Sequence, residues 1–120
     1  MMHLVNSRTS ESVASSVEIA DTRKAKRRGL LGRASLASGS AMLLPSCCAV
    51  HTVGMRFAID VAFLDAGGRI RKIVRNLPPW RIAMAPGAAM TIELAAGGLD
   101  AQAVRVGDEL RVVPAPQGAN

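Results

Sequence analysis

Aromatic side chains are almost absent from this 120-residue sequence, which has two phenylalanines, one tryptophan and no tyrosine. Proteins that bind single-stranded nucleic acid without sequence preference stack successive bases on several aromatic side chains. Three aromatic residues do not suffice for such a platform, so we exclude this class of site. Apolar residues nevertheless make up 49% of the chain, enough for one core built mainly from aliphatic side chains, alanine and methionine.

Cysteine is scarce as well, because the only two are the adjacent Cys47 and Cys48. Neighbouring cysteines are poorly placed to bridge each other, and two thiols without a third partner favour a reducing compartment. The first 21 residues lack the apolar run of a secretory signal, and no stretch is long enough for a transmembrane helix. We therefore expect a soluble, cytoplasmic protein that does not insert into a membrane.

Familiar catalytic and metal-binding motifs are missing. The sequence has no glycine-rich phosphate loop, no Gly-x-Ser-x-Gly elbow and no His-Glu-x-x-His motif. Cys47, Cys48 and His51 lie close together, but they lack a paired spacing such as Cys-x-x-Cys. We predict no metal site and no cofactor. Whether the chain is an enzyme stays open, and the lack of a recognised catalytic motif favours a role other than catalysis.

Positive charge is plentiful, with a net charge of +6. A basic chain favours anionic partners such as nucleic acid, an acidic membrane surface, or small phosphates and carboxylates. Eleven of the 15 cations fall into two groups, in residues 21–33 and 69–81. Both groups fit solvated faces. As an alternative, a short basic helix over about 22–31, capped by Asp21 or Thr22, docks the chain on a partner or on nucleic acid.

Alternation of apolar and polar residues predicts the central elements. In residues 55–64 the odd positions are bulky and apolar, which is typical of a strand with one core face. Asp65-Ala66-Gly67-Gly68 is a turn sequence, and residues 69–75 form the returning strand of a hairpin. Shorter strands are expected around 17–21, at 41–44, at 80–82, at 90–94 and at 110–113, with a helical turn within 95–103.

These elements predict a mainly β fold, a small antiparallel sandwich or barrel of jelly-roll type with one or two short helices. Residues 1–15 are polar and serine-rich, and we expect a disordered leader there. Residues 16–113 form a single β domain in this interpretation. The tail over 114–120 is expected to be frayed.

Asp60 is the one carboxylate on the second face of the predicted hairpin. With a turn centred on Ala66-Gly67, residues whose numbers sum to 133 face each other, so that Asp60 meets Ile73 and has Arg71 and Arg75 as diagonal neighbours. A structural interpretation is an ion pair with either arginine, or acceptance of backbone N–H bonds. In the functional interpretation the small neighbours of Asp60 leave space, and Asp60 forms the floor of a pocket.

Several motifs resemble one family. These are His51-Thr52, Met55-Arg56-Phe57, Ile59-Asp60 and Phe63-Leu64-Asp65, followed by NLPPWR, IELAAG and VGDEL, with the basic segment ADTRKAKRRGLLGR upstream. Over residues 18–113 the chain is similar to the domain-of-unknown-function 192 (DUF192) family of small prokaryotic proteins. The resemblance implies a mainly β sandwich and no assigned activity, cofactor or partner. The segment between Gly97 and Gly107 is shorter here than the family usually has.

The first functional hypothesis is a binding module for a small polar or anionic ligand. Its site is a shallow pocket, for which the predicted lining residues are His51, Thr52, Arg56, Asp60, Trp80 and Arg81. The second is the accessory protein that docks through the basic helix. The third is a hydrolase-type enzyme with His51 as base and Asp60 or Glu93 orienting it. Glu93 is otherwise expected to be exposed or paired with an arginine.

Overall fold

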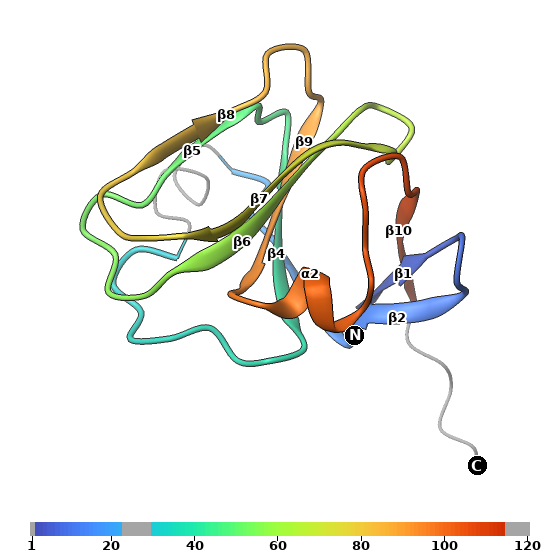
Figure 1. The fold of residues 1–120 in the computed structure, drawn as a ribbon, viewed down its shortest axis with the longest axis horizontal. Coiled ribbons are helices and arrows are strands. Elements are labelled where there is room, and N and C mark those ends of the chain that lie inside the picture. Colours follow the sequence, from blue (N-terminus) through green and yellow to red (C-terminus); the bar gives the residue numbers. More distant parts are fainter. Residues whose placement is uncertain (1, 23–29, 115–120) are drawn as a thin grey trace.

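The computed structural model describes residues 2–22 and 30–114. Nearly all of the regular structure in this part of the chain is β (Figure 1). A single short helix, α2 (Gly98–Ala101), lies in the predicted segment. The strands are β1 (Met2–Asn6), β2 (Glu11–Ala14), β3 (Ser16–Ile19), β4 (Ser40–Pro45), β5 (Ala49–His51), β6 (Ile59–Leu64), β7 (Ile70–Leu77), β8 (Ile82–Met84), β9 (Met90–Ala95) and β10 (Leu110–Pro114).

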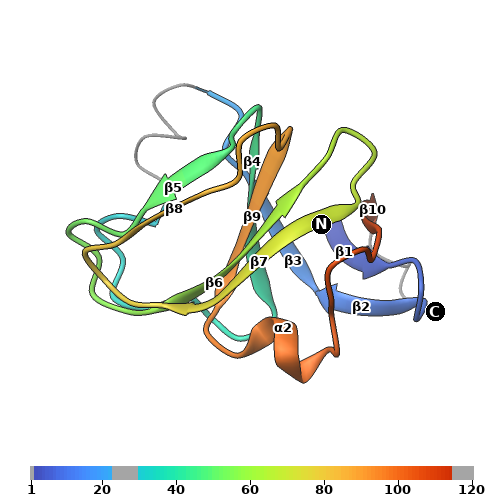
Figure 2. The ribbon, with the colours of Figure 1, turned by 45° about the horizontal axis from the view of Figure 1, so that its top comes forward.

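The strands form a layered arrangement around one central sheet (Figure 2). The central sheet has the order β3-β4-β9-β6-β7, and its strands are antiparallel except for the parallel pair β3 and β4. A three-stranded sheet, β10-β1-β2, and a two-stranded ribbon, β5-β8, complete the described strands. The prediction of a mainly β, sandwich-like fold is therefore confirmed, with mixed strand directions in the central sheet.

Two apolar clusters lie on opposite faces of the central sheet. The first core joins Ala62, Leu64, Ile92 and Leu94 to residues of β1, β2, β10 and α2. The second core joins Ile59, Val61 and Phe63 to the ribbon residues Val50 and Ala83. Strand β6 is buried along its whole length because both of its faces are covered. The prediction of an open, arginine-rich second face is therefore wrong.

The predicted hairpin is present as β6 and β7, but its register differs from the prediction. Ala62 pairs with Ile73, and irregularities occur at Ile59/Val61 and at Phe63/Leu64. Bulges of this kind shift the pairing between the two strands. The turn itself forms as expected, because the Asp65 side chain accepts hydrogen bonds from the amides of Gly67 and Arg69.

The expectation of a disordered leader over residues 1–15 is wrong, since β1 and β2 occupy most of it. Strand β1 pairs with β10 from Met2↔Pro114 to Asn6↔Leu110, so a partner more than 100 residues away orders this segment. Pro114 is the last residue of β10, and the rest of the predicted frayed tail lies outside the described residues. The core of the predicted basic helix, residues 23–29, also lies outside them. Among the described residues no helix has the length and apolar character needed to cross a bilayer.

Candidate ligand-binding surface

Asp60 is buried, and its carboxylate binds backbone amides of neighbouring segments. Its side chain is only 1% exposed, and its two carboxyl oxygens accept three backbone N–H bonds. The amide of Asn76 donates to Oδ1 at 2.8 Å, and those of Gly97 and Leu99 donate to Oδ2 at 3.1 Å each. Of the alternatives for Asp60, the structure therefore shows the acceptance of backbone N–H bonds, which ties β7 and the start of α2 to β6.

Thr52 connects two loops at the end of the β5-β8 ribbon. Its buried hydroxyl donates to the carbonyl of Pro78 at 2.6 Å and accepts the amide N–H of Arg81 at 2.9 Å. Its backbone carbonyl accepts N–H bonds from both Met55 and Trp80, at 3.1 and 2.9 Å. Thr52 therefore fixes the conformation of both loops.

Trp80 is held in an unusual conformation. Its backbone φ is 66°, in the left-handed region that bulky residues avoid, and such a conformation costs about 1–3 kcal/mol. The hydrogen bond from its amide to Thr52 maintains this backbone, while the side chain remains 65% exposed. The fold therefore fixes the backbone of Trp80 and leaves its large indole mostly exposed.

Two cationic residues and a histidine lie near the backbone of Trp80. Arg81 is exposed, and its Nη1 donates to the carbonyl of Trp80 at 3.3 Å. Arg56 is exposed and directly follows Met55. The backbone amides of Met55 and Trp80 both donate to the carbonyl of Thr52. His51 pairs across the ribbon with Ile82, and its Nδ1 accepts the amide N–H of Val53 at 3.3 Å. We call these four exposed residues, His51, Arg56, Trp80 and Arg81, the Trp80 surface.

The six predicted site residues thus fall into two groups. Four form the Trp80 surface, whereas Thr52 and Asp60 are buried and bonded to the backbone. Within the described part of the chain, the structure shows no hydrogen bond or ion pair between His51 and a carboxylate. The hydrogen bonds that the structure shows for Asp60 go to the backbone amides of Asn76, Gly97 and Leu99, and none goes to the imidazole.

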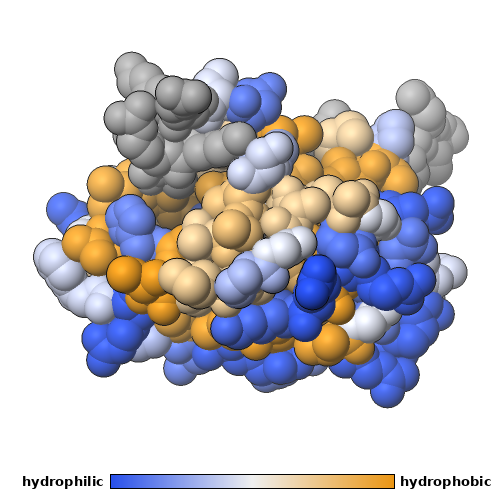
Figure 3. Space-filling model, turned by 90° about the horizontal axis from the view of Figure 1, so that it is seen from above, coloured by the Kyte–Doolittle hydropathy of each residue, from blue (hydrophilic) through white to orange (hydrophobic). Residues whose placement is uncertain are grey.

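An apolar strip continues from the Trp80 surface along the ribbon. Ile82 is 68% and Met84 50% exposed, because residues at alternate positions of β8 point away from the second core. Viewed from above, apolar residues gather across this side of the molecule (Figure 3). Ordered apolar surface with polar residues at its margin is typical of interaction sites.

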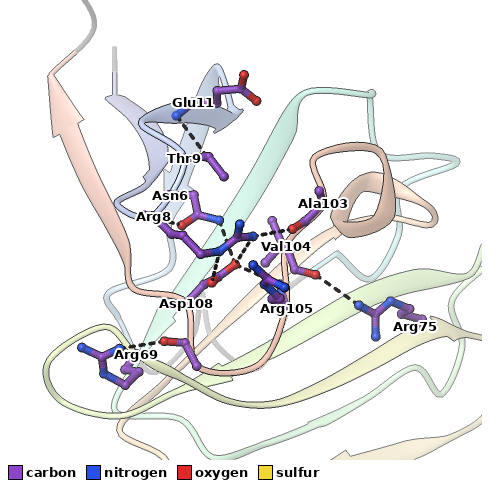
Figure 4. A network of polar contacts seen from close by, with 11 residues as sticks. Asn6, Arg8, Thr9, Glu11, Arg69, Arg75, Ala103, Val104, Arg105 and Asp108 are labelled. Carbon is purple, nitrogen blue, oxygen red and sulfur yellow. Dashed lines mark hydrogen bonds and ion pairs between the residues drawn. The ribbon is translucent and has the colours of Figure 1, made fainter.

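A second polar cluster, which the sequence did not reveal, surrounds Asp108 (Figure 4). Its buried carboxylate accepts hydrogen bonds from Arg8 Nε at 2.7 Å, from the Asn6 side chain at 2.9 Å and from the Arg105 amide at 3.0 Å. The hydrogen bonds from Arg8, helped by the other two donors, hold the pKa of Asp108 well below its usual range. Its partners Asn6 and Arg8 lie in the segment that was expected to be disordered.

Two clefts lie away from the Trp80 surface. One, of about 340 Å³, lies beside the Asp108 cluster and is lined in part by Ser7, Arg69 and Glu109. The other, of about 310 Å³, lies between the start of β4, the end of β9 and α2. Neither cleft includes a predicted site residue.

Glu93 is buried, although the sequence suggested an exposed or arginine-paired side chain. It is 4% exposed, and its Oε1 has no hydrogen-bond partner, so the expectation of an exposed or arginine-paired carboxylate is wrong. Burial raises the pKa of Glu93 to about 7. Its cross-strand partners Met42 and Val61 belong to the second core, which places the carboxyl group on that side of the sheet.

A match to a protein-family model shows which family the chain belongs to. The DUF192 model, described as uncharacterized ACR, matches residues 4–112. The chain belongs to the DUF192 family. A search of curated proteins found no match to this DUF192 domain.

Two solved structures have the same fold as this DUF192 domain. A putative transcription regulator from Sinorhizobium meliloti 1021 is 23% identical, with a TM-score of 0.78 over 92% of this chain and 91% of that one. A protein of unknown function from Novosphingobium aromaticivorans DSM 12444 is 19% identical, with a TM-score of 0.78 over 92% of this chain and 82% of the other. At these identities the similarity concerns the fold.

Proposed function

We propose that this protein is a binding module whose Trp80 surface binds a small anionic ligand with a planar body. The observation that carries the proposal is the exposed Trp80, whose strained backbone is bonded to Thr52. Backbone strain persists only where the surrounding structure enforces it, and it is concentrated at ligand-binding and catalytic sites. A surface loop without a binding role could present a smaller residue, or glycine, at a left-handed φ without this cost.

The roles of the four residues follow from their chemistry. The indole of Trp80 offers an apolar face on which a planar ring can stack. The guanidinium groups of Arg56 and Arg81 match the geometry of carboxylate and phosphate oxygens. His51 adds a ring N–H that can donate a hydrogen bond. Buried Thr52 holds the two loops in position relative to each other and acts as a positioning residue.

Fluorescence of Trp80, the only tryptophan of the chain, tests this proposal. Adenosine 5′-monophosphate serves as a probe that combines a planar ring with a phosphate. We expect a saturable change in Trp80 emission, with a dissociation constant of about 1 mM or below, which corresponds to roughly −4 kcal/mol. The Arg81→Ala variant should bind about tenfold more weakly, since it loses one charge-assisted contact.

Matched controls separate the two features of the ligand. Adenosine lacks the charge and inorganic phosphate lacks the ring, so each should bind more weakly than the nucleotide. The Arg111→Ala variant removes the same charge from β10 and should bind as the native protein does. Absence of saturable binding by the nucleotide, or equal weakening by Arg81→Ala and Arg111→Ala, would refute the proposed site.

A second candidate function is docking on nucleic acid through the basic segment of the sequence. It is supported by five cations within residues 23–28 and by the similarity in fold to a putative transcription regulator. If the segment binds duplex DNA through phosphates, affinity should fall more than about tenfold between about 50 and 200 mM salt. The double variant Arg27→Ala/Arg28→Ala should reduce this salt dependence, whereas Arg105→Ala/Arg111→Ala should not. Binding that is absent at low salt, or insensitive to salt, excludes this function.

A further inference from the structure

Glu93 is the most unusual ionisable group of the second core. Strand β9 lies between β4 and β6, so Glu93 occupies the middle of the central sheet. Its side chain is 4% exposed, and Oε1 has no hydrogen-bond partner. A buried carboxylate is normally paired or bonded to several donors, because an isolated charge is strongly disfavoured away from water. The site is therefore compatible with a neutral carboxylic acid.

The groups that face Glu93 do not compensate its charge. The second core consists of apolar residues from β4, β6 and β7, from the ribbon, and from the segments that flank these strands. Cys47 is the ionisable residue that packs against this core among those described, and its thiol donates to the carbonyl of Ala49. Arg56 is exposed beside Met55, and Lys72 is exposed and donates to the carbonyl of Met84.

The ribbon is the element most easily displaced from this core. Strand β9 is hydrogen-bonded to a neighbour on each side, whereas β5 and β8 pair only with each other among the described strands. Val50 and Ala83 hold the ribbon on the sheet through packing. Side-chain hydrogen bonds add to this packing, one from the Thr91 hydroxyl to the carbonyl of Cys47 at 2.7 Å and one from Lys72 Nζ to the carbonyl of Met84 at 2.8 Å. Water that reaches an ionised Glu93 would therefore displace the ribbon before it disrupts the sheet.

We propose that Glu93 is a proton-dependent latch, whose neutral form allows the β5-β8 ribbon to pack on the central sheet and whose ionised form loosens it. Because Trp80 and His51 lie at one end of this ribbon, ionisation of Glu93 also weakens the Trp80 surface. This last step rests on the proposed binding function, whereas the latch itself does not.

The direction of the pH dependence follows from linkage. The pKa of Glu93 in the folded protein is raised to about 7 from an ordinary value of 4.5. The folded state therefore holds the proton more tightly than the unfolded state does. The contribution of protonated Glu93 to the stability of the fold is fully present below pH 4.5 and is lost as the pH rises through 7. The difference of 2.5 pKa units corresponds to about a 300-fold decrease in the folding equilibrium constant.

Hydrogen exchange of backbone amides from pH 5 to 9, without ligand, tests the latch. After correction for the intrinsic pH dependence of exchange, protection of Val50 and Ala83 should fall by about tenfold or more as the pH rises through 7. Protection of Ile92 and Val61 in the central sheet should stay above that of the ribbon throughout this range, because these amides exchange only when the sheet itself opens. In Glu93→Gln, which keeps the shape of the side chain without its charge, ribbon protection should not change with pH.

Further variants make the result decisive. Glu93→Met fills the same space with an apolar side chain and gives a second test if the glutamine variant folds poorly. Glu11→Gln changes an exposed acid and should behave as the native protein does. The latch is refuted if both Glu93 variants keep the native pH dependence, or if ribbon amides are as strongly protected as sheet amides above pH 7. Failure of nucleotide binding with a pH-dependent ribbon would refute the binding function alone.

Discussion

Replacing Asp60 with alanine is expected to destabilise the fold by about 3–5 kcal/mol. Three backbone N–H groups, those of Asn76, Gly97 and the buried Leu99, would lose their acceptor at once. Natural domains are stable by about 5–15 kcal/mol, so a large part of the variant population could be unfolded at room temperature. Urea denaturation followed by circular dichroism measures this loss directly.

Two comparisons identify the cause of this loss. Asp60→Asn keeps one acceptor oxygen but presents an NH₂ group to at least one of the three donors, so an intermediate loss is expected. Asp100→Ala removes a mostly exposed carboxylate that pairs with Arg75, and it should cost less than about 1 kcal/mol. An Asp60→Ala variant within about 1 kcal/mol of the native protein would contradict the role of Asp60 as an anchor.

Replacing Asp108 with asparagine is expected to cost about 2–3 kcal/mol at neutral pH. The carboxylate accepts two hydrogen bonds from Arg8 and one each from Asn6 and the Arg105 amide, and it joins β1 to the segment before β10. Its pKa is lowered in the folded state, so its stabilising effect is present above its ordinary value of 3.8 and decreases as the pH falls below it.

Denaturation at several pH values tests this expectation. The difference in unfolding free energy between the native protein and Asp108→Asn should be largest above about pH 5 and should shrink toward pH 2. Arg8→Ala combined with Asp108→Asn should be less destabilising than the sum of the two single changes, because both remove the same ion pair. Glu109→Gln alters the neighbouring carboxylate as a control. A difference that does not depend on pH would argue against a stabilising charge at Asp108.

Local patterns in the sequence predicted the hairpin, because a turn sequence and strict alternation depend on residues near one another. The register was not predictable in the same way. Bulges near Ile59 and Phe63 arise where β6 adapts to β7 on one side and β9 on the other. Strand β1 was missed for a related reason, since its partner β10 lies at the other end of the sequence.

The candidate site was only partly predictable. The sequence grouped six residues into one site, but burial divides them, and burial depends on layers that come from distant segments. Glu93 illustrates this limit. Alternation placed it opposite Ile92 and Leu94, on a face that was taken to be exposed, whereas the β5-β8 ribbon and the segments beside it cover that face. The left-handed φ of Trp80 has no signal in composition or spacing.

The most direct test of the central claim is a nuclear magnetic resonance titration of the labelled protein with adenosine 5′-monophosphate. The claim is that the Trp80 surface binds the ligand while Asp60 holds the fold together. We therefore expect saturable shifts of the Trp80 indole N–H and of the Thr52 and Arg81 amides, with little change at Asn76, Gly97 and Leu99. Shifts concentrated at these last three amides, or no saturable shift at Trp80, would contradict the account.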